Sequence, residues 1–160
     1  MEEVVIRGAV SADIPVLGRL GALLVRAHHD LDPQRFIAAM PGTEKGYGSF
    51  LGRQLEEDNI IVQVAERDGE VIGYTYAGME DYDYMSLRGP AGVLYDIVVD
   101  PAHREHGVGR MLLDAAISAL KERGAPRVIL ETAQKNTSAQ RLFERAGFRC
   151  TMIEMTRELD

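Results

Sequence analysis

The chain has 160 residues, a length that fits one domain, and we expect a single domain over residues 1–160. With 46% hydrophobic and 27% charged residues, its composition is that of a globular protein and not of a disordered or fibrous one. The formal net charge of −7 argues against a nucleic-acid or anionic-membrane binder, and no apolar run is long enough to cross a bilayer.

The first part of the chain predicts a strand followed by helices. Val4–Ile6 is short and β-branched and predicts a strand. Asp13 to about His28 begins with helix-start residues and carries leucines at helical spacing, so it predicts an amphipathic helix. A second, short helix is expected from Asp32 to a Pro-Gly stop at Pro41, and a third helix over Phe50–Glu57.

The middle of the chain predicts three strands. Ile60–Glu66 and Val71–Met79 are β-branched and aromatic, and the Asp-Gly pair between them is a hairpin signal. Glu80–Gly92 is polar and rich in tyrosine, which predicts a surface loop. Val93–Val99 is nearly all apolar, which predicts a central strand buried on both faces.

The last part predicts alternating helices and strands. A helix with its apolar face at Leu112–Leu120 ends at Gly124, and Val128–Leu130 predicts a buried strand. A helix over Thr137–Arg145 precedes a closing strand or hairpin over Phe148–Leu159. Antiparallel strands come first and strand–helix–strand–helix–strand follows, so we expect an α+β (mixed α/β) fold around one mixed sheet.

A glycine-containing loop is the strongest chemical signal. Arg104–Arg110 lies between a predicted strand and a predicted helix and contains Gly107 and Gly109. Glycines let the backbone approach a ligand, and the first amides of a helix suit a phosphate or pyrophosphate. A plain strand-to-helix turn is the alternative. Leu112 stands where a dinucleotide-binding motif needs its third glycine, which argues against that motif.

Two motifs resemble those of a known family. Val98–Gly109 resembles R-x-x-G-x-G/A, the acyl-CoA-binding signature of the GNAT N-acetyltransferase superfamily, and Asn136–Phe148 resembles the second motif of that superfamily. Together they cover about Val93 to Phe148, in the expected order and context. The resemblance implies a GNAT-like acyl-CoA N-acyltransferase fold, in which a mixed central sheet with splayed central strands is flanked by helices. It also implies acetyl-CoA as the cosubstrate.

The resemblance assigns specific residues to coenzyme A. The backbone of the central strand would pair with the pantetheine arm, and amides at the helix start would hold the pyrophosphate. A bulge in that strand would free the amide of Val98 or its neighbour to polarise the acetyl oxygen. The assigned residues are Ile97, Val98 and Val99; Arg104, Glu105, His106, Gly107, Val108, Gly109 and Arg110; and Asn136, Ala139, Arg141 and Phe143.

Three residues are candidates for the chemistry. Asp96 is the first choice for the general base, because a carboxylate inside an apolar strand is costly and needs a partner or a task. A structural hydrogen bond is the alternative role. Glu131, at the end of the next strand, is the reserve base. Tyr95 is either a catalytic hydroxyl or a core aromatic bonded at the sheet edge.

One position departs from the family pattern. Phe143 stands where the family commonly has a tyrosine that protonates the departing thiolate. Tyr74, Tyr76 or Tyr95 could take that role, or the proton could come from water. Phe143 also supports the alternative of a non-catalytic coenzyme-A-binding sensor.

We therefore expect an N-acetyltransferase that moves an acetyl group from acetyl-CoA to a primary amine by direct attack in a ternary complex. The acceptor would be a small molecule or a peptide, and the acidic, aromatic run Glu80–Tyr84 would suit a cationic amine. Transfer of a longer acyl group is a further alternative. We expect no nucleic-acid or membrane partner, and a homodimer is plausible through C-terminal strands with a free edge.

Cysteine and histidine usage points away from disulfides and metals. Cys150 is the only cysteine, so no intrachain disulfide or cysteine-based zinc site is expected. The pairs His28 with His29 and His103 with His106 lack the spacing of a helical zinc motif, so we expect no metal. The N-terminal residues lack the features of a secretory signal, which predicts a cytoplasmic location.

Overall fold

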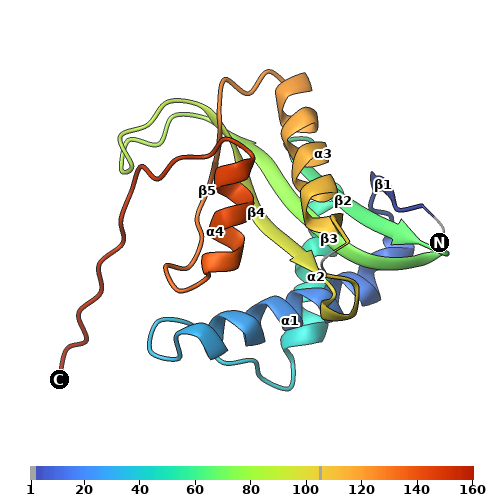
Figure 1. Ribbon diagram of the computed structural model, residues 1–160, viewed down its shortest axis with the longest axis horizontal. Coiled ribbons are helices and arrows are strands. Elements are labelled where there is room, and N and C mark those ends of the chain that lie inside the picture. The colour runs from blue at the N-terminus through green and yellow to red at the C-terminus, as the bar shows by residue number, and fades with distance from the viewer. Residues whose placement is uncertain (1–2, 105) are drawn as a thin grey trace.

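A mixed sheet of five strands forms the centre of the fold (Figure 1). A mixed sheet was expected from the sequence. The computed structural model describes residues 3–104 and 106–160. The sheet has the order β1-β2-β3-β4-β5, antiparallel except that β5 runs parallel to β4. Its strands are β1 (Val5–Gly8), β2 (Ile60–Arg67), β3 (Glu70–Glu80), β4 (Ala91–Val99) and β5 (Val128–Leu130).

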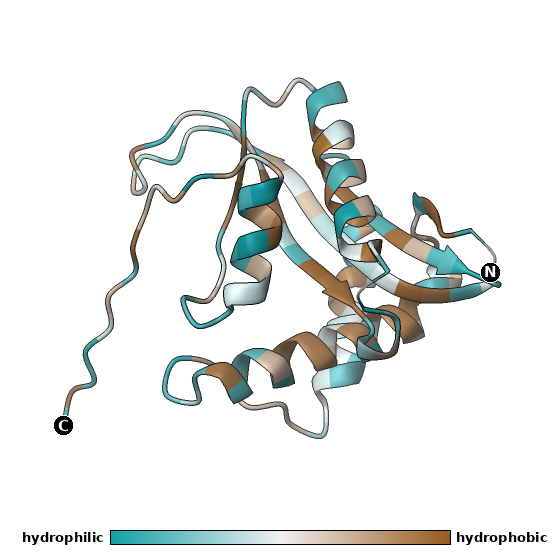
Figure 2. Cartoon of the chain, in the orientation of Figure 1, coloured by the Kyte–Doolittle hydropathy of each residue, from teal (hydrophilic) through white to brown (hydrophobic). Residues whose placement is uncertain are grey.

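Two pairs of helices cover the two faces of the sheet (Figure 1). One face carries α1 (Ile14–Leu31) and α2 (Thr43–Gln54), and the other carries α3 (Val108–Glu122) and α4 (Thr137–Arg145). Figure 2 shows hydrophobic residues concentrated on the strands and on the helix sides that face them. Burial of these apolar faces is the main stabilising contribution to the layered arrangement.

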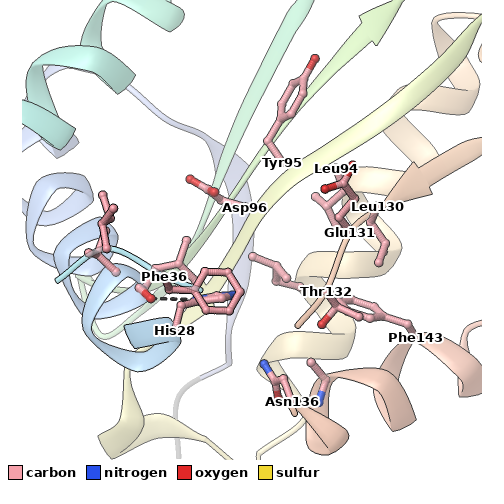
Figure 3. A pocket seen from close by; sticks show the side chains of 15 residues that line it. His28, Phe36, Leu94, Tyr95, Asp96, Leu130, Glu131, Thr132, Asn136 and Phe143 are labelled. Atoms are coloured by element: carbon pink, nitrogen blue, oxygen red, sulfur yellow. Dashed lines mark hydrogen bonds between the residues drawn. The ribbon is translucent and has the colours of Figure 1, made fainter. Parts of the chain in front are cut away.

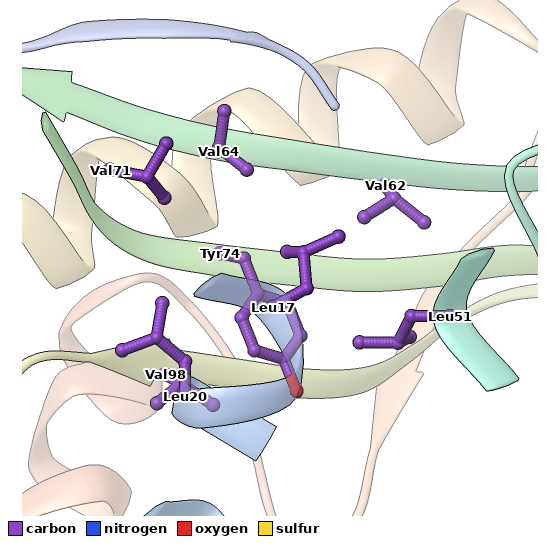
Figure 4. Close-up of a cluster of buried hydrophobic side chains, with 8 residues drawn as sticks. All are labelled: Leu17, Leu20, Leu51, Val62, Val64, Val71, Tyr74 and Val98. Atoms are coloured by element: carbon purple, nitrogen blue, oxygen red, sulfur yellow. The ribbon is translucent and has the colours of Figure 1, made fainter. Parts of the chain in front are cut away.

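The core under α1 and α2 also determines the position of the functional site. Leu17 and Leu20 of α1 pack with Leu51 of α2 against β2, β3 and β4 (Figure 4). Tyr74 of β3 lies fully buried among them, with its hydroxyl at the lower edge of the cluster. A buried tyrosine hydroxyl needs a hydrogen-bond partner, so this residue constrains what lies beside β4.

Helix α2 differs from the predicted third helix because two helices approach closely. It begins at Thr43 and not at Phe50. A Cβ atom at Gly48 of α2 would come within 3.1 Å of the Ile14 carbonyl oxygen of α1, and one at Gly52 within 2.8 Å of the Ile14 side chain. The glycines that weaken the helix signal thus permit the packing that stabilises the helix.

Two further predictions are wrong. The segment predicted as a helix from Asp32 to Pro41 forms turns and irregular chain, with Pro33 at its start. The segment Phe148–Leu159, predicted as a strand or hairpin, forms neither. A strand needs a partner for its backbone groups, and among the described residues of this chain the segment has none.

The central strands splay, as the family resemblance implied. β4 pairs with β5 only from Gly92 to Leu94, and a register shift against β3 leaves Tyr95 without an opposite residue. The Asp100 amide donates to the Ile72 carbonyl oxygen at 2.8 Å, so the backbone of Asp100 faces β3. Backbone N–H and C=O groups alternate in direction along a strand, so those of Val98 also face β3, whereas those of Ile97 and Val99 face away from it. The freed backbone groups are therefore those of Ile97 and Val99, and not the Val98 amide.

Candidate functional site

A cavity of about 280 Å³ opens where β4 and β5 diverge (Figure 3). One wall comes from α1 and the chain that follows it, the floor from β4, and the other wall from the end of β5 and from α4. The lining residues are mostly apolar, with polar groups at a few points. They are Leu24, Val25, His28, Phe36, Ile37, Leu94, Tyr95, Asp96, Ile97, Leu130, Glu131, Thr132, Asn136, Ala139 and Phe143.

Asp96 lies partly buried at the floor of this cavity and accepts two phenol hydrogen bonds. Its Oδ2 atom accepts from the Tyr47 hydroxyl at 2.6 Å and from the Tyr74 hydroxyl at 2.9 Å. Burial raises the pKa of Asp96 above its ordinary value, while the two phenols act in the opposite direction. Within the described residues, the hydrogen-bond partners of the Asp96 carboxylate are thus two tyrosine hydroxyls and not a loop amide. A carboxylate with a raised pKa that faces a cavity is suited to accept a proton.

Tyr47 is the hydrogen-bond partner of Asp96 that sequence reasoning missed. Its ring packs against Gly21 on α1, and its hydroxyl reaches Asp96 across 49 positions of sequence. The available signal was the spacing of Tyr47, Leu51 and Leu55, which marks one helical face. Burial and the nearby carboxylate raise the pKa of Tyr47, so its hydroxyl stays protonated as a donor.

His28 adds a second polar group to the cavity. Its Nδ1 atom lies 2.8 Å from the Leu24 carbonyl oxygen, which can only accept, so we assign the proton to Nδ1. In that tautomer of the imidazole, Nε2 is left as an acceptor. Phe36 packs edge-on against this ring with centroids 5.0 Å apart, which fixes its orientation (Figure 3).

Glu131 and Tyr95 both line the cavity, but they differ in orientation. Glu131 follows β5 directly and is exposed at the rim. The Tyr95 hydroxyl donates to Glu80, and Figure 3 shows its side chain directed away from Asp96. The structure thus places Glu131 with Asp96 around one cavity and supports the sheet-edge role of Tyr95.

The loop after β4 presents free backbone donors at the start of α3. Gly107 has a φ of 76°, a left-handed conformation that favours glycine, and no side chain caps the helix. The amides of Val108, Gly109 and Arg110 have no intrahelical acceptor, as in the first turn of any helix. A Cβ atom at Gly109 would meet only Leu142 and Val99 at ordinary contact distances. Glu105, also assigned to this loop, lies outside the described residues.

The basic side chains around this loop hold it in place. Arg104 Nε donates to the Val99 carbonyl oxygen at 3.2 Å, and Arg110 forms an exposed pair with Asp114 at 3.0 Å. His106 is exposed beside Gly107. Arg104 therefore ties the loop to the freed edge of β4, and its side chain is exposed.

The second motif lies at the start of α4, across the opening. Asn136 Oδ1 accepts from the Ala139 amide at 3.1 Å and so caps α4, which leaves its Nδ2 donor for the cavity (Figure 3). Phe143 is buried and forms part of the cavity wall. Arg141 is exposed on the same helix and does not line the cavity wall given above.

The tyrosines expected to replace the missing acid have their protons bonded elsewhere. Tyr74 donates to Asp96, Tyr76 donates to Gln54 at 3.1 Å, and Tyr95 donates to Glu80. Burial raises the pKa of Tyr74, so it is a poor acid. The geometry therefore favours water as the source of the proton for a departing thiolate.

The run Glu80–Tyr84 is bound within its own loop. Glu80 pairs with Arg88 at 2.5 Å, and Asp83 accepts from the Ser86 hydroxyl at 2.8 Å. The acidic residues that line the cavity are instead Asp96 and Glu131. Over residues 3–104 and 106–160 there is no group of three or more potential metal ligands. In the same part of the chain no helix is long and apolar enough to cross a membrane.

Comparisons with known proteins agree with this arrangement. The model of the acetyltransferase (GNAT) family matches residues 25–148. A mycothiol acetyltransferase of Thermobispora bispora is 38% identical over 89 residues, which are 53% of this chain and 28% of that protein. The chain thus spans about a quarter of the length of such relatives.

Solved structures share the fold at low sequence identity. A mutant of the BH1408 protein from Bacillus halodurans superposes with a TM-score of 0.83 and 22% identity, covering 97% of this chain and 99% of that one. The aminoglycoside N-acetyltransferase AAC(6')-Iy in complex with CoA has a TM-score of 0.76 and 21% identity, covering 99% and 96%.

Proposed function

Because the chain belongs to the GNAT family of acetyltransferases, we propose that it moves an acetyl group from acetyl-CoA to a primary amine by direct attack in a ternary complex. The observation that carries this proposal is the position of Asp96. It lies at the floor of a cavity between splayed strands, with two phenols bonded to it. No covalent enzyme intermediate is required, since both substrates can reach the same cavity.

The residues present fit acetyl-CoA. The amides of Val108–Arg110 and the left-handed Gly107 offer donors for a pyrophosphate, and the adjacent Arg104 adds positive charge. The outward backbone groups of Ile97 and the outward amide of Val99 provide a strand edge for an extended amide-containing arm. When bound there, acetyl-CoA supplies the acetyl group as a reactive thioester. The relative AAC(6')-Iy was crystallised with CoA, which supports the same assignment.

Asp96 would act as the general base. A protonated amine has a pKa of about 10.4 and is not nucleophilic, so a proton must leave the nitrogen. The raised pKa of Asp96 makes it a stronger base than an exposed carboxylate, while the phenols of Tyr47 and Tyr74 keep it ionised enough to accept. Asp96 takes the proton from the amine, directly or through one water, and general-base help of this kind contributes roughly 10²–10⁴-fold.

The lining of the cavity suggests the class of acceptor. Leu24, Val25, Phe36 and Ile37 present an apolar wall, and Glu131 places a carboxylate at the rim. An amine attached to a small apolar body fits this combination, because Glu131 attracts the charged form before Asp96 neutralises it. Relatives named for mycothiol and for the alanine of ribosomal protein bS18 support a small-molecule or a peptide acceptor.

Mass spectrometry of an amine panel incubated with acetyl-CoA tests the proposal. We expect one acetyl group on at least one amine with an apolar body, and a loss of about 10²-fold or more in rate for Asp96→Asn. Tight binding of coenzyme A without transfer to any amine would instead support the non-catalytic sensor. Faster transfer from a longer acyl-CoA would change the assigned acyl donor but would leave Asp96 as the general base.

A further inference from the structure

The wall that α1 and the chain after it contribute to the cavity holds one polar side chain among the described residues. Figure 3 shows His28 and Phe36 on this side of the cavity and Asn136 on the other side. The remaining lining residues of this wall are apolar, namely Leu24, Val25, Phe36 and Ile37. Proton removal by Asp96 leaves His28 without a task, although a half-buried imidazole carries a polar atom that needs a partner.

The ring of His28 is held so that one of its nitrogens stays available. Its Nδ1 atom bonds to the Leu24 carbonyl oxygen at 2.8 Å, and Phe36 packs edge-on against the ring. In the tautomer that this bond requires, Nε2 has an unshared electron pair. Within residues 3–104 and 106–160, no donor bonds to that atom. Nε2 is therefore an oriented acceptor that a ligand in the cavity can use.

His28 lies level with Asp96 along the slot. Arg19 Nη1 bonds to Asp100 at 3.0 Å, which places an early turn of α1 beside the end of β4. From Arg19 to His28 the helix advances by about 13 Å, and from Asp100 back to Asp96 the strand covers about the same length. Because His28 and Asp96 line the same cavity, the two elements run antiparallel. His28 thus lies at the end of the slot where Asp96 meets the amine, away from the amides that start α3.

Three groups that accept hydrogen bonds line this end of the cavity. Asp96 offers its Oδ1 atom, because both phenols bond to Oδ2. Glu131 offers a carboxylate at the rim, and His28 offers Nε2. The two carboxylates serve the charged amine, whereas an imidazole acceptor suits an uncharged donor such as a hydroxyl. A carboxylate on the ligand would face an electron pair there instead of a proton.

We propose that His28 determines acceptor specificity, with Nε2 accepting a hydrogen bond from a hydroxyl group that the acceptor carries near its reactive amine. The substrate class is then an amino alcohol whose apolar part contacts Phe36 and Ile37. This inference rests on the proposed acetyl transfer. An acceptor without the hydroxyl displaces water from Nε2 and leaves that atom unpaired, and sites of this kind discriminate against such analogues by roughly ten- to a hundredfold.

Matched amines that differ in one group test this assignment. The pairs are phenylethanolamine with β-methylphenethylamine, ethanolamine with propylamine, and propanolamine with butylamine. In each pair a hydroxyl replaces a methyl group of similar size. For the unaltered protein we expect kcat/KM to favour the hydroxyl member of at least one pair by about tenfold or more, mainly through KM. A ratio near one in every pair overturns the proposal.

Two substitutions of His28 locate the preference on Nε2. His28→Phe keeps an aromatic ring against Phe36 and removes both nitrogens, so we expect the preference to fall to about twofold or less through a higher KM for the hydroxyl member. His28→Gln keeps an acceptor oxygen and should retain part of the preference. A preference that survives in His28→Phe overturns the proposal. A rise in KM for acetyl-CoA alone would assign Nε2 to the cofactor and would also overturn it.

His29→Phe is the matched control for a structural effect. His29 Nδ1 bonds to the Phe36 carbonyl oxygen at 2.9 Å, and His29 does not line the cavity described above. Substitution there disturbs the same segment of chain without touching Nε2 of His28. We expect His29→Phe to keep the preference for the hydroxyl member. An equal loss in the two variants would make the role of His28 structural and would contradict the proposal.

Calorimetry with coenzyme A separates this inference from the proposed function. The same pairs are titrated into the protein saturated with coenzyme A, where binding requires no acetyl transfer. We expect the same preference in affinity for the hydroxyl member. Preferential binding without acetylation of that member would contradict the proposed function and support the role of His28. Acetylation of both members with equal KM would do the reverse.

Discussion

Replacing Tyr47 by phenylalanine removes the 2.6 Å hydrogen bond to Asp96 and leaves the ring that packs on Gly21. A hydrogen bond to a charged group contributes about 1.5–3 kcal/mol, and one pKa unit corresponds to about 1.36 kcal/mol. The pKa of Asp96, which burial already raises, should therefore rise by roughly one to two further units. The ionised base then forms only at higher pH.

The assay is the pH dependence of kcat/KM for an amine identified by the panel, because its acid limb reports the base of the free enzyme. We expect Tyr47→Phe to move that limb upward by about one to two units while the rate above it is retained. Tyr76→Phe is the matched control, since the Tyr76 hydroxyl donates to Gln54 and not to Asp96. An unmoved limb in Tyr47→Phe, or an equal movement in Tyr76→Phe, would refute the assignment of the base.

Three other perturbations probe separate parts of the structure. Gly107→Ala and Gly124→Ala each place a side chain at a positive φ, 76° and 89°, and each should lower the free energy of unfolding by about 1–2 kcal/mol. In calorimetry only Gly107→Ala should weaken acetyl-CoA binding. Equal losses of affinity in the two variants would contradict the pyrophosphate site. Arg7 lowers the pKa of Asp13, so the stability from this pair is present above the unfolded pKa and is lost as pH falls through the lower folded pKa. Thermal unfolding of Asp13→Asn should therefore approach that of the unaltered protein in strong acid, and a gap that persists there would disprove the linkage. Glu131→Gln should raise KM for charged amines several-fold and leave the acid limb unmoved; a loss of kcat as large as in Asp96→Asn would make Glu131 the base.

Local sequence patterns were sufficient to predict the elements that position the loop after β4. The hairpin of β2 and β3, the apolar β4 and the amphipathic α3 each carry their periodicity within a few residues of sequence. The free amides at the start of α3 follow from the same order, because the first turn of any helix leaves its amides without intrahelical acceptors. These elements were therefore predictable from the residues alone.

Features that depend on distant partners were not predictable in this way. The glycines of α2 weaken its helical signal, and only the close approach of Gly18 on α1 to Glu44 and Gly48 explains why they are there. The bond from Tyr47 to Asp96 joins positions 49 residues apart. The sequence of residues 148–159 predicts a strand, but a strand forms only where its backbone groups can pair with those of another strand.

The most direct measurement is the crystal structure of the complex with acetyl-CoA. The account predicts the pyrophosphate on the amides of Val108–Arg110, the pantetheine arm along Ile97 and Val99, and the acetyl carbon in the cavity beside Asp96. A cofactor bound elsewhere, or an acetyl group out of reach of Asp96 even through one water, would contradict the proposed chemistry.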